Sequence, residues 1–335
     1  MKHMLLGYAV PKGLEQMTGE DARKLTHVNV AFGVIRDGLL DMSKLSCLKD
    51  EMKRIRPMNP GLKFVLSVGG WGAGGFSDMS LREKGRRDFA ESVGRALDEY
   101  GLDGVDIDWE YPCSRDAGID ADPRDKENFT LLLQQLRRVA GERIVSIAAG
   151  GGAYFVRDTE MNRVAEVCDY VQIMTYDLRG GFTTQAGHHT GLYPTAGDES
   201  GRSTADCVEL FHKAGVPYDR IVIGAAFYAR RWDNVPDVNH GLMQQTGSVG
   251  QYGAGYGQLT REFIGKNGFV RYWDDRAQAP YLFNGSTFIS YDDPQSIACK
   301  CAYLREKGLR GIMYWEHASD DTHTLLDAMY RALQP

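Results

Sequence analysis

Three acidic residues alternate with apolar residues in the segment DGVDIDWEYP, at 103–112. The acids are Asp106, Asp108 and Glu110. On a β-strand this period of two places all three carboxylates on one face and the apolar side chains on the other. Like charges held this close raise at least one pKa, so that one carboxylic acid keeps its proton at neutral pH. The pattern therefore predicts general acid catalysis at this strand.

Two structural explanations for this acidic strand fit its neighbours less well. A solvent-exposed edge strand would have no reason to carry Gly104 within it, or Trp109 and Tyr111 at its end. A calcium loop needs closely spaced oxygen ligands in a flexible turn, whereas β-branched residues separate these acids. Few structural roles favour three carboxylates on one face, so a catalytic role is the interpretation that we adopt.

Strand-like and helix-like segments alternate along the chain. The segments 82–100 and 125–140 have apolar residues three and four positions apart, which is typical of amphipathic helices. Eight runs have the composition of buried strands: 4–10, 27–33, 63–69, 103–109, 144–150, 169–176, 220–228 and 309–315. Such alternation predicts an α/β fold, a (β/α)8 TIM barrel with active residues at the C-terminal strand ends. An open doubly wound sheet is the alternative, but no glycine-rich nucleotide loop follows the first run.

The interval between the seventh and eighth predicted strands is too long for one helix. Within it, 232–291 is rich in glycine and aromatic residues, and this aromatic content is too high for a disordered loop. Its strand-like pieces lie at 269–273 and 286–290. We therefore expect an α+β insertion subdomain at 232–291. Barrel strands one to seven would lie in 1–231, and 292–335 would complete the barrel, with a helix that starts near Pro294.

Composition and charge exclude several classes of function. The chain has 335 residues, a hydrophobic fraction of 43% and a formal net charge of −6, without a run of Lys or Arg. Nucleic acid and membranes are therefore not expected as partners, and no apolar run approaches the ~20 residues that span a bilayer. The eight histidines show no HxH or HExxH spacing, so we expect no metal and no other cofactor. His188 and His189 are adjacent in a Gly/Thr-rich loop, where we expect them to face solvent or substrate.

The cysteines and the N-terminal segment bear on the cellular compartment. None of the six cysteines has the spacing of a disulfide framework or a zinc ribbon, so we expect free thiols. The apolar stretch 4–10 is short, contains Gly7 and is followed by Pro11, which is untypical of a signal peptide. These features predict a cytoplasmic protein, or a secreted one if an export signal has been removed. We expect it to be a monomer.

Aromatic residues lie at the ends of most predicted strands. They include Tyr8, Phe32 and the segments SVGGW, MTYD, FYARRW and MYWE, which end at Trp71, Asp177, Trp232 and Glu316. A barrel mouth lined by such side chains suits sugar rings, whose C–H faces pack on aromatic planes. A nucleic-acid stacking platform would also be aromatic, but it would need a basic surface that this chain lacks. Beside the acidic strand, the pattern favours a carbohydrate-active site.

These motifs resemble those of one enzyme family. DGVDIDWEYP is similar to the DxxDxDxE signature of glycoside hydrolase family 18, the chitinase family, and it falls on the fourth predicted strand. SVGG, MTYD, FYxR and YDDPQS (291–296) extend the resemblance over nearly the whole chain, and the intervals suit members with an α+β chitinase insertion domain. The resemblance implies a chitinase that hydrolyses β-1,4 linkages between N-acetylglucosamine units. Its substrate would be chitin or a chito-oligosaccharide.

The resemblance also implies a retaining, substrate-assisted mechanism. The acetamido oxygen of the substrate attacks the anomeric carbon and gives an oxazolinium ion. Glu110 would protonate the glycosidic oxygen and then activate water, while Asp108 would orient the acetamido group and stabilise its positive charge. Asp106 would share a proton with Asp108, so that the set titrates as a coupled unit. Tyr176 would donate a hydrogen bond to the acetamido oxygen.

Substrate-binding and supporting residues are implied in the same way. Asp177 would hydrogen-bond the distorted sugar, Trp315 would lie beneath it, and Trp71 would form a platform on the leaving-group side. The other expected wall and anchor residues are Tyr8, Phe32, Met174, Tyr228 and Arg230. Ser67 would hydrogen-bond Asp106.

One position departs from the pattern of the family. Many relatives have Trp a few residues after MTYD, whereas DLRGG leads to Phe182 in this chain. This change would weaken one contact on the leaving-group side, or Phe182 would pack within its own loop. No chitin-binding module is evident in the sequence, which favours soluble chito-oligosaccharides over crystalline chitin.

Three other functions share parts of the pattern. An N-glycan endoglycosidase or a peptidoglycan N-acetylglucosaminidase would carry the same strand signature, although Trp109, Tyr111 and the insertion favour a chitinase. A carbohydrate-binding lectin on the same barrel would have lost the acid at Glu110, which this chain keeps.

Overall fold

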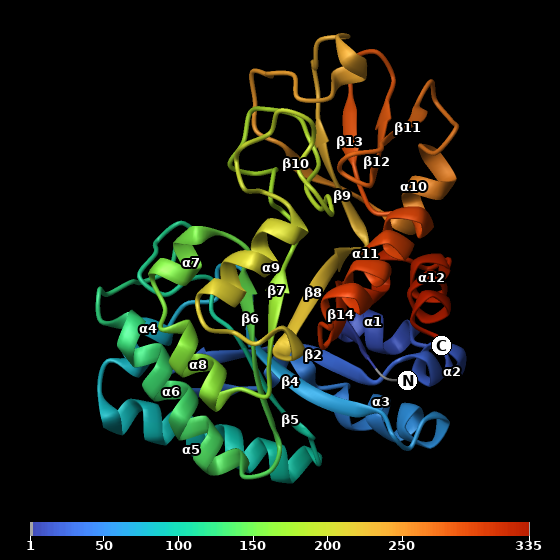
Figure 1. Cartoon of the computed structure of the whole chain (residues 1–335). Helices are drawn as coiled ribbons and strands as arrows, with labels where there is room; N and C mark the ends of the chain where they lie inside the picture. The colour runs from blue at the N-terminus through green and yellow to red at the C-terminus, as the bar shows by residue number, and fades with distance from the viewer. Residues whose placement is uncertain (1–2, 335) are drawn as a thin grey trace.

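A closed barrel dominates the computed structural model, which describes residues 3–334 (Figure 1). In the described part, eight parallel strands pair in the order β1, β14, β8, β7, β6, β5, β4, β2, and β1 also pairs with β2, which closes the ring. The strands are β1 (Met4–Ala9), β2 (His27–Arg36), β4 (Lys63–Gly69), β5 (Gly104–Asp108), β6 (Ile144–Gly150), β7 (Tyr170–Met174), β8 (Ile221–Ala226) and β14 (Gly311–Trp315). Each strand lies within a few residues of its predicted run. The predicted (β/α)8 barrel is confirmed.

Helices surround the barrel and connect its parallel strands, which cannot be joined by tight turns. The predicted amphipathic segments are α5 (Glu83–Tyr100) and α6 (Asp125–Ala140). The helix expected near Pro294 is α11 (Pro294–Lys307), which begins after Asp293, whose carboxylate accepts hydrogen bonds from two N–H groups of the first turn. The other helices around the barrel are α1 (Pro11–Gln16), α2 (Gly19–Lys24), α3 (Leu48–Ile55), α4 (Phe76–Ser80), α7 (Ala153–Arg157), α8 (Met161–Val167), α9 (Thr204–Lys213) and α12 (Thr324–Leu333). The short elements are β3 (Leu39–Asp41), antiparallel to β2, and the 3-10 turns η1 (Ser43–Leu45), η2 (Arg56–Met58), η3 (Tyr218–Arg220), η4 (Asn239–Gly241) and η5 (His317–Ser319).

The alternation along β5 divides its side chains between two layers. Val105, Ile107 and Trp109 belong to the apolar core between the barrel and its helices. Asp106 and Asp108 are buried on the other face, toward the barrel interior. The interior contains a second apolar cluster: Met4, Leu6, Tyr8, Ala31, Ala148, Tyr170, Met174, Tyr176, Val222, Ala226, Tyr228 and Met313. The period of two therefore places the acids on the inner face, as the sequence predicted.

A second, antiparallel sheet forms the upper lobe in Figure 1, where β8 continues into β9. Its strand order is β10 (Gln251–Gly255), β9 (Tyr228–Trp232), β13 (Phe288–Ser290), β12 (Ala279–Phe283) and β11 (Val270–Asp274), with α10 (Tyr256–Glu262) beside it. The two strand-like pieces predicted from sequence correspond to β11 and β13. The sheet begins at Tyr228, before the boundary expected at 232. Trp232 and Phe288 lie in its own apolar core.

Several other properties of the described residues bear on function. No helix within 3–334 is long and apolar enough to cross a membrane. No group of three or more His, Cys, Asp or Glu side chains in that range is arranged to hold a metal ion. All six cysteines are free thiols.

Candidate active site

Asp106 lies at the centre of the barrel and accepts four hydrogen bonds from four other strands. Tyr8 Oη and Ser67 Oγ donate to Oδ2 at 2.9 and 2.8 Å. Ser146 Oγ and Gln172 Nε2 donate to Oδ1 at 2.8 and 2.9 Å. Burial raises the pKa of Asp106, and the four hydrogen bonds oppose this rise because they stabilise the anion. The hydrogen bond predicted between Ser67 and Asp106 is present.

Asp106 and Asp108 interact through their charges. Each carboxylate oxygen of Asp106 accepts two hydrogen bonds, and none of these four bonds comes from Asp108. The charge of Asp106 contributes to raising the pKa of Asp108. The expected sharing of a proton between the two acids stays a prediction.

Asp108 ends β5 and has no compensating cation. It is buried, and its Oδ1 atom has no hydrogen-bond partner within the described part of the chain. Burial raises the pKa of Asp108 well above its usual range, and the charges of Glu110 and Asp106 add to this rise. Asp108 therefore favours its neutral form, with one oxygen unpaired at the end of the strand.

Glu110 follows Asp108 at the same edge of the barrel. Burial raises the pKa of Glu110 to about 7, and the charge of Asp177 adds to the rise, whereas a hydrogen bond with Tyr111 opposes it. A carboxylic acid that titrates near neutral pH is suited to give up a proton and then take one back. This agrees with the sequence-based prediction that one acid of the strand keeps its proton.

Tyr176 lies just beyond the end of β7 and faces these acids. It is buried, and its Oη atom is 3.8 Å from Met313 Sδ. Burial raises the pKa of Tyr176 well above 10, and the charges of Asp108 and Glu110 raise it further. The hydroxyl therefore remains a hydrogen-bond donor close to both carboxyl groups.

Asp177 differs from the strand acids because it is paired with a cation, Arg230. Arg230 Nε and Nη2 each donate to one of its carboxylate oxygens at 2.6 Å. His189 Nδ1 lies 3.5 Å from Asp177 Oδ1. Burial alone would raise the pKa of Asp177, but Arg230 and His189 outweigh it and hold the pKa below its usual range. Asp177 is therefore an anion in a fixed orientation.

The two adjacent histidines are both buried, so of the two expected positions, facing solvent or facing substrate, the first is wrong. His189 contacts Asp177 from behind the site. His188 Nε2 lies 3.3 Å from Asp274 Oδ2, on β11 of the second sheet. Each histidine binds a carboxylate, which the glycine and threonine content of their loop did not indicate.

The aromatic side chains at the strand ends form three groups, two of which line the barrel mouth. Phe32 is stacked on Trp315 with ring centroids 5.4 Å apart, and Tyr8 packs against Trp315 at 5.7 Å. Tyr228 is stacked on Tyr252 at 4.5 Å with an interplanar angle of 8°. Tyr252 lies on β10 and is 56% exposed, so the second sheet contributes an accessible ring to this wall. The structure thus brings Tyr8, Phe32 and Trp315 together, as predicted.

A third aromatic group is more exposed than the others. Trp71 is 55% exposed and Phe182 is 74% exposed, with their ring centroids 5.9 Å apart. Trp71 also lies 6.3 Å from Tyr111, which follows Glu110. Phe182 therefore does not pack within its own loop but extends the surface of Trp71.

The remaining predicted binding residue, Met174, is almost fully buried. It ends β7 and packs in the inner barrel cluster with Tyr8, Tyr176 and Tyr228. Its place is beneath the aromatic walls.

Sequence analysis missed four residues that complete the site. Ser146 and Gln172 are polar residues at inward positions of apolar strands, and this signal was available in VSIAAG and YVQIM. His189 was expected to face solvent or substrate, but its contact with Asp177 was not predicted. Tyr252 gave no signal, because its contact with Tyr228 depends on how the second sheet pairs β10 with β9.

This geometry can be compared with known proteins. The sequence profile of glycosyl hydrolases family 18 matches residues 4–320. The chain belongs to this family. Among curated family 18 relatives, chitinase A1 of Niallia circulans is 38% identical over 82% of this chain, and the endochitinase of Manduca sexta is 30% identical over 92%. The chain spans 43% and 60% of the length of these two proteins, respectively, or about half of each.

Solved structures of family 18 proteins have the same fold. An N-acetylglucosaminidase from Paenibacillus barengoltzii is 50% identical and superposes with a TM-score of 0.97, covering 99% of this chain and 100% of that one. The chitinase ChiW from Paenibacillus sp. str. FPU-7 is 34% identical, with a TM-score of 0.93, and the match covers 100% of this chain and 33% of that one. Family 18 membership therefore rests on both sequence and structure.

Proposed function

We propose that this family 18 chain is a retaining chitinase that cleaves β-1,4 linkages between N-acetylglucosamine units of soluble chito-oligosaccharides. The observation that carries the proposal is the arrangement on and after β5. Asp108 favours its neutral form, Glu110 has a pKa of about 7, and the Tyr176 hydroxyl lies close to both. These are the groups that a substrate-assisted hydrolysis requires.

Glu110 serves as the general acid and then as the general base. At neutral pH it holds its proton in a substantial fraction of molecules, so it can protonate the glycosidic oxygen as the bond to the anomeric carbon breaks. The acetamido oxygen of the substrate forms the new bond to that carbon and gives an oxazolinium ion. Glu110, now a carboxylate, then takes a proton from the water that attacks the same carbon, which restores the original configuration.

Asp108 and Tyr176 hold the internal nucleophile. The unpaired Oδ1 of Asp108 is an acceptor for the acetamido N–H. Once the proton of the neutral acid has passed to Asp106, the Asp108 carboxylate would stabilise the positive charge that develops there. The Tyr176 hydroxyl is placed to donate to the acetamido oxygen. Alignment of an internal nucleophile can lower a barrier by several kcal/mol, at best by about 7–11.

The aromatic groups and Asp177 orient the sugar. Trp315 supplies a plane beneath the ring, and Asp177 supplies an anionic acceptor for a sugar hydroxyl because Arg230 fixes its orientation. Trp71 and Phe182 provide an exposed apolar surface on the leaving-group side.

The experiment that tests the proposal is product analysis by mass spectrometry after incubation of chitohexaose with the wild type and with Glu110→Gln. The wild type should release shorter N-acetylated fragments. The variant should fold normally and lose at least ~100-fold in turnover, since general acid assistance is typically worth that much. Cellohexaose, which lacks the acetamido group, is the matched substrate control and should stay intact. Cleavage of cellohexaose, or a near-wild-type rate for the variant, would refute the mechanism.

The 50% identical structure favours a second candidate, an exo-acting N-acetylglucosaminidase. The same digestion distinguishes the two activities. Early release of the monosaccharide would support the exo enzyme, whereas early fragments of intermediate length would support a chitinase. An intact hexamer with every variant would direct the search to N-glycan or peptidoglycan substrates, or to a binding role.

A further inference from the structure

A buried ion pair lies behind the candidate site and contacts no group assigned to the chemistry. Lys300 of α11 is 0% exposed, and its Nζ atom lies 2.6 Å from Asp292 Oδ2. Asp292 also accepts hydrogen bonds from the backbone N–H of Ala226 at 3.0 Å and from Ser296 Oγ at 2.7 Å. A pair of charges this deeply buried is costly unless each charge is hydrogen-bonded, and these bonds fix the positions of both side chains.

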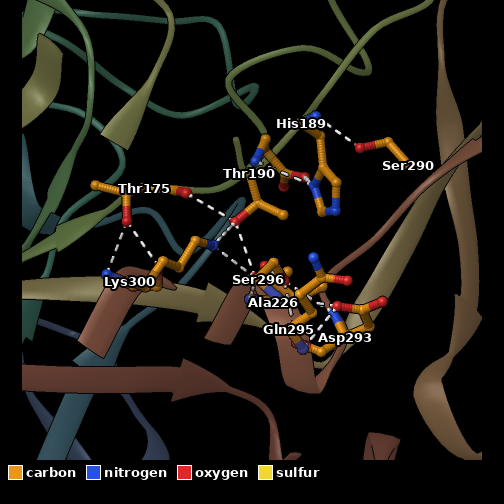
Figure 2. Close-up of polar contacts among 12 residues, drawn as sticks. Thr175, His189, Thr190, Ala226, Ser290, Asp293, Gln295, Ser296 and Lys300 are labelled. Atoms are coloured by element: carbon orange, nitrogen blue, oxygen red, sulfur yellow. Dashed lines mark hydrogen bonds and ion pairs between the residues drawn. The ribbon is translucent and has the colours of Figure 1, made fainter. Parts of the chain in front are cut away.

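Thr190 connects this ion pair to the loop that follows β7. Lys300 Nζ donates to Thr190 Oγ1 at 2.6 Å, and the hydroxyl lies 3.1 Å from both the Thr175 carbonyl oxygen and Asp292 Oδ2. Figure 2 shows Lys300 and Thr175 approaching Thr190. The hydroxyl has one proton to give. The Thr175 carbonyl and Asp292 Oδ2 are its two acceptors at equal distance, so the hydroxyl joins the Thr175 peptide to the ion pair.

The Thr175 peptide leads directly into the site. Thr175 precedes Tyr176 and Asp177, and its Oγ1 also donates to the Gly224 carbonyl at 2.7 Å. His189, the residue before Thr190 in the chain, contacts Asp177. The loop is therefore fixed at two adjacent residues, one bonded to the backbone before Tyr176 and one to the side chain after it.

We propose that Lys300, Asp292 and Thr190 are positioning residues, which set the Thr175 carbonyl and thereby hold Tyr176 and Asp177 in the orientation that hydrolysis requires. This inference rests on the proposed function. None of the three residues touches the acids of β5. Their effect passes through the hydroxyl-to-carbonyl hydrogen bond of Thr190.

Thr190→Val is the sharpest variant for a test. Lys300→Met would leave Asp292 unpaired in the core, and loss of folding would then hide any effect on the site. Thr190→Val keeps both charges and the β-branched shape but removes the hydroxyl from the Thr175 carbonyl. Thr190→Ser keeps the hydroxyl and is the conservative counterpart.

Thr26→Val is the matched control. Thr26 Oγ1 donates to the Leu5 carbonyl at 3.0 Å, which is the same kind of hydrogen bond, but it precedes β2 at the opposite end of the barrel. The four proteins, including the wild type, are compared for chitohexaose turnover and for thermal melting. Melting shows that each variant is folded at the assay temperature.

Thr190→Val should lose about 10- to 100-fold in kcat without a matching rise in KM, because small displacements of reacting groups have effects of this size. Thr190→Ser should restore most of the kcat, and Thr26→Val should keep the wild-type kcat even if its melting temperature falls. If Thr190→Val is no slower than Thr26→Val, or if Thr190→Ser is as slow as Thr190→Val, the inference is wrong while the proposed function stands. If the wild type does not cleave chitohexaose, the proposed function is wrong and the inference falls with it.

Discussion

Two groups of carboxylates in this molecule have opposite surroundings. The first group is on and after β5: Asp106, Asp108 and Glu110. The second group lies around the β7–β8 loop and the second sheet: Asp177, Asp274 and Asp292. Within residues 3–334, no member of the first group forms an ion pair, whereas Asp177 pairs with Arg230, Asp292 pairs with Lys300 and Asp274 is hydrogen-bonded to His188.

The surroundings set opposite pKa shifts. Burial without a cation raises the pKa of Asp108 and of Glu110. In the second group burial acts in the same direction, but hydrogen bonds from Arg230 and His189 lower the pKa of Asp177, and those from His188 help to lower that of Asp274 to about 2. For Asp177 and Asp274, hydrogen-bond partners therefore outweigh the effect of burial on the pKa, and the partners of Asp177 include the guanidinium of Arg230.

The difference separates two tasks that a carboxylate can perform. An acid that must hold a proton needs burial without a cation, and it therefore destabilises the folded state at neutral pH. An acid that must stay anionic in one orientation needs a cation with good geometry. An acid of the first kind can transfer a proton in the reaction, and an acid of the second kind holds another group in position.

The largest effect expected from this comparison is on stability. The same Asp→Asn substitution should destabilise the folded protein at Asp292 and stabilise it at Asp108. Asp292→Asn leaves the buried Lys300 without its counter-charge, and loss of one partner of such a pair typically costs about 3–5 kcal/mol. Asp108→Asn removes an acid whose pKa is raised in the folded state. As pH rises above 3.8, the unfolded value, ionisation of this acid destabilises the folded state. At pH 7 the substitution should therefore raise the free energy of unfolding by about 0.5–2 kcal/mol. Urea denaturation at pH 7 measures both changes.

An exposed ion pair provides the control for this prediction. Lys307 and Glu209 form a pair at 2.7 Å on the surface, and Glu209→Gln should change the free energy of unfolding by about 1 kcal/mol or less. If Asp108→Asn destabilises the protein at pH 7 as Asp292→Asn does, the two groups of carboxylates do not differ in the way proposed.

The second effect is the pH dependence of hydrolysis. Glu110 must be protonated to act as an acid, and its pKa is about 7, so kcat/KM should fall as pH rises through 7, by about 10-fold per pH unit above it. A pH profile of kcat/KM on chitohexaose measures the position of this limb.

Asp177→Asn sharpens this test, because the charge of Asp177 contributes to raising the pKa of Glu110. The variant should be slower, and its alkaline limb should move to lower pH. An unshifted limb, or a wild-type profile that stays flat to pH 9, would show that Glu110 is not the titrating acid.

The acidic strand could be predicted from sequence because its information is local. A period of two in one short segment places Asp106, Asp108 and Glu110 on one face, and the apolar residues between them must pack outward. The eight strands were predictable for the same reason, and the first turn of α11 was marked by its Pro. These features depend on neighbours in the chain.

The cation-paired group depends on contacts that are remote in sequence, and it was largely missed. Lys300 is separated from Thr190 by 110 residues, and His188 from Asp274 by 86. No local pattern shows which of many Lys, Arg and His side chains will reach a given carboxylate. The four donors to Asp106 come from four different strands, so only the closed barrel brings all of them to this acid.

The smallest effect concerns His188, at the edge of the cation-paired group. His188→Asn should lower the free energy of unfolding at pH 6 by about 1 kcal/mol, because it weakens one hydrogen bond to the Asp274 carboxylate. The folded-state pKa of Asp274 is lowered from 3.8 to about 2, so its stability contribution is full above the unfolded value and is lost as pH falls through the folded one. The difference between variant and wild type in urea denaturation should therefore shrink between pH 6 and pH 3. If the difference in free energy of unfolding is the same at both pH values, His188 acts through packing alone. The comparison would then hold for Asp177 and Asp292, which pair with Arg230 and Lys300, but not for Asp274.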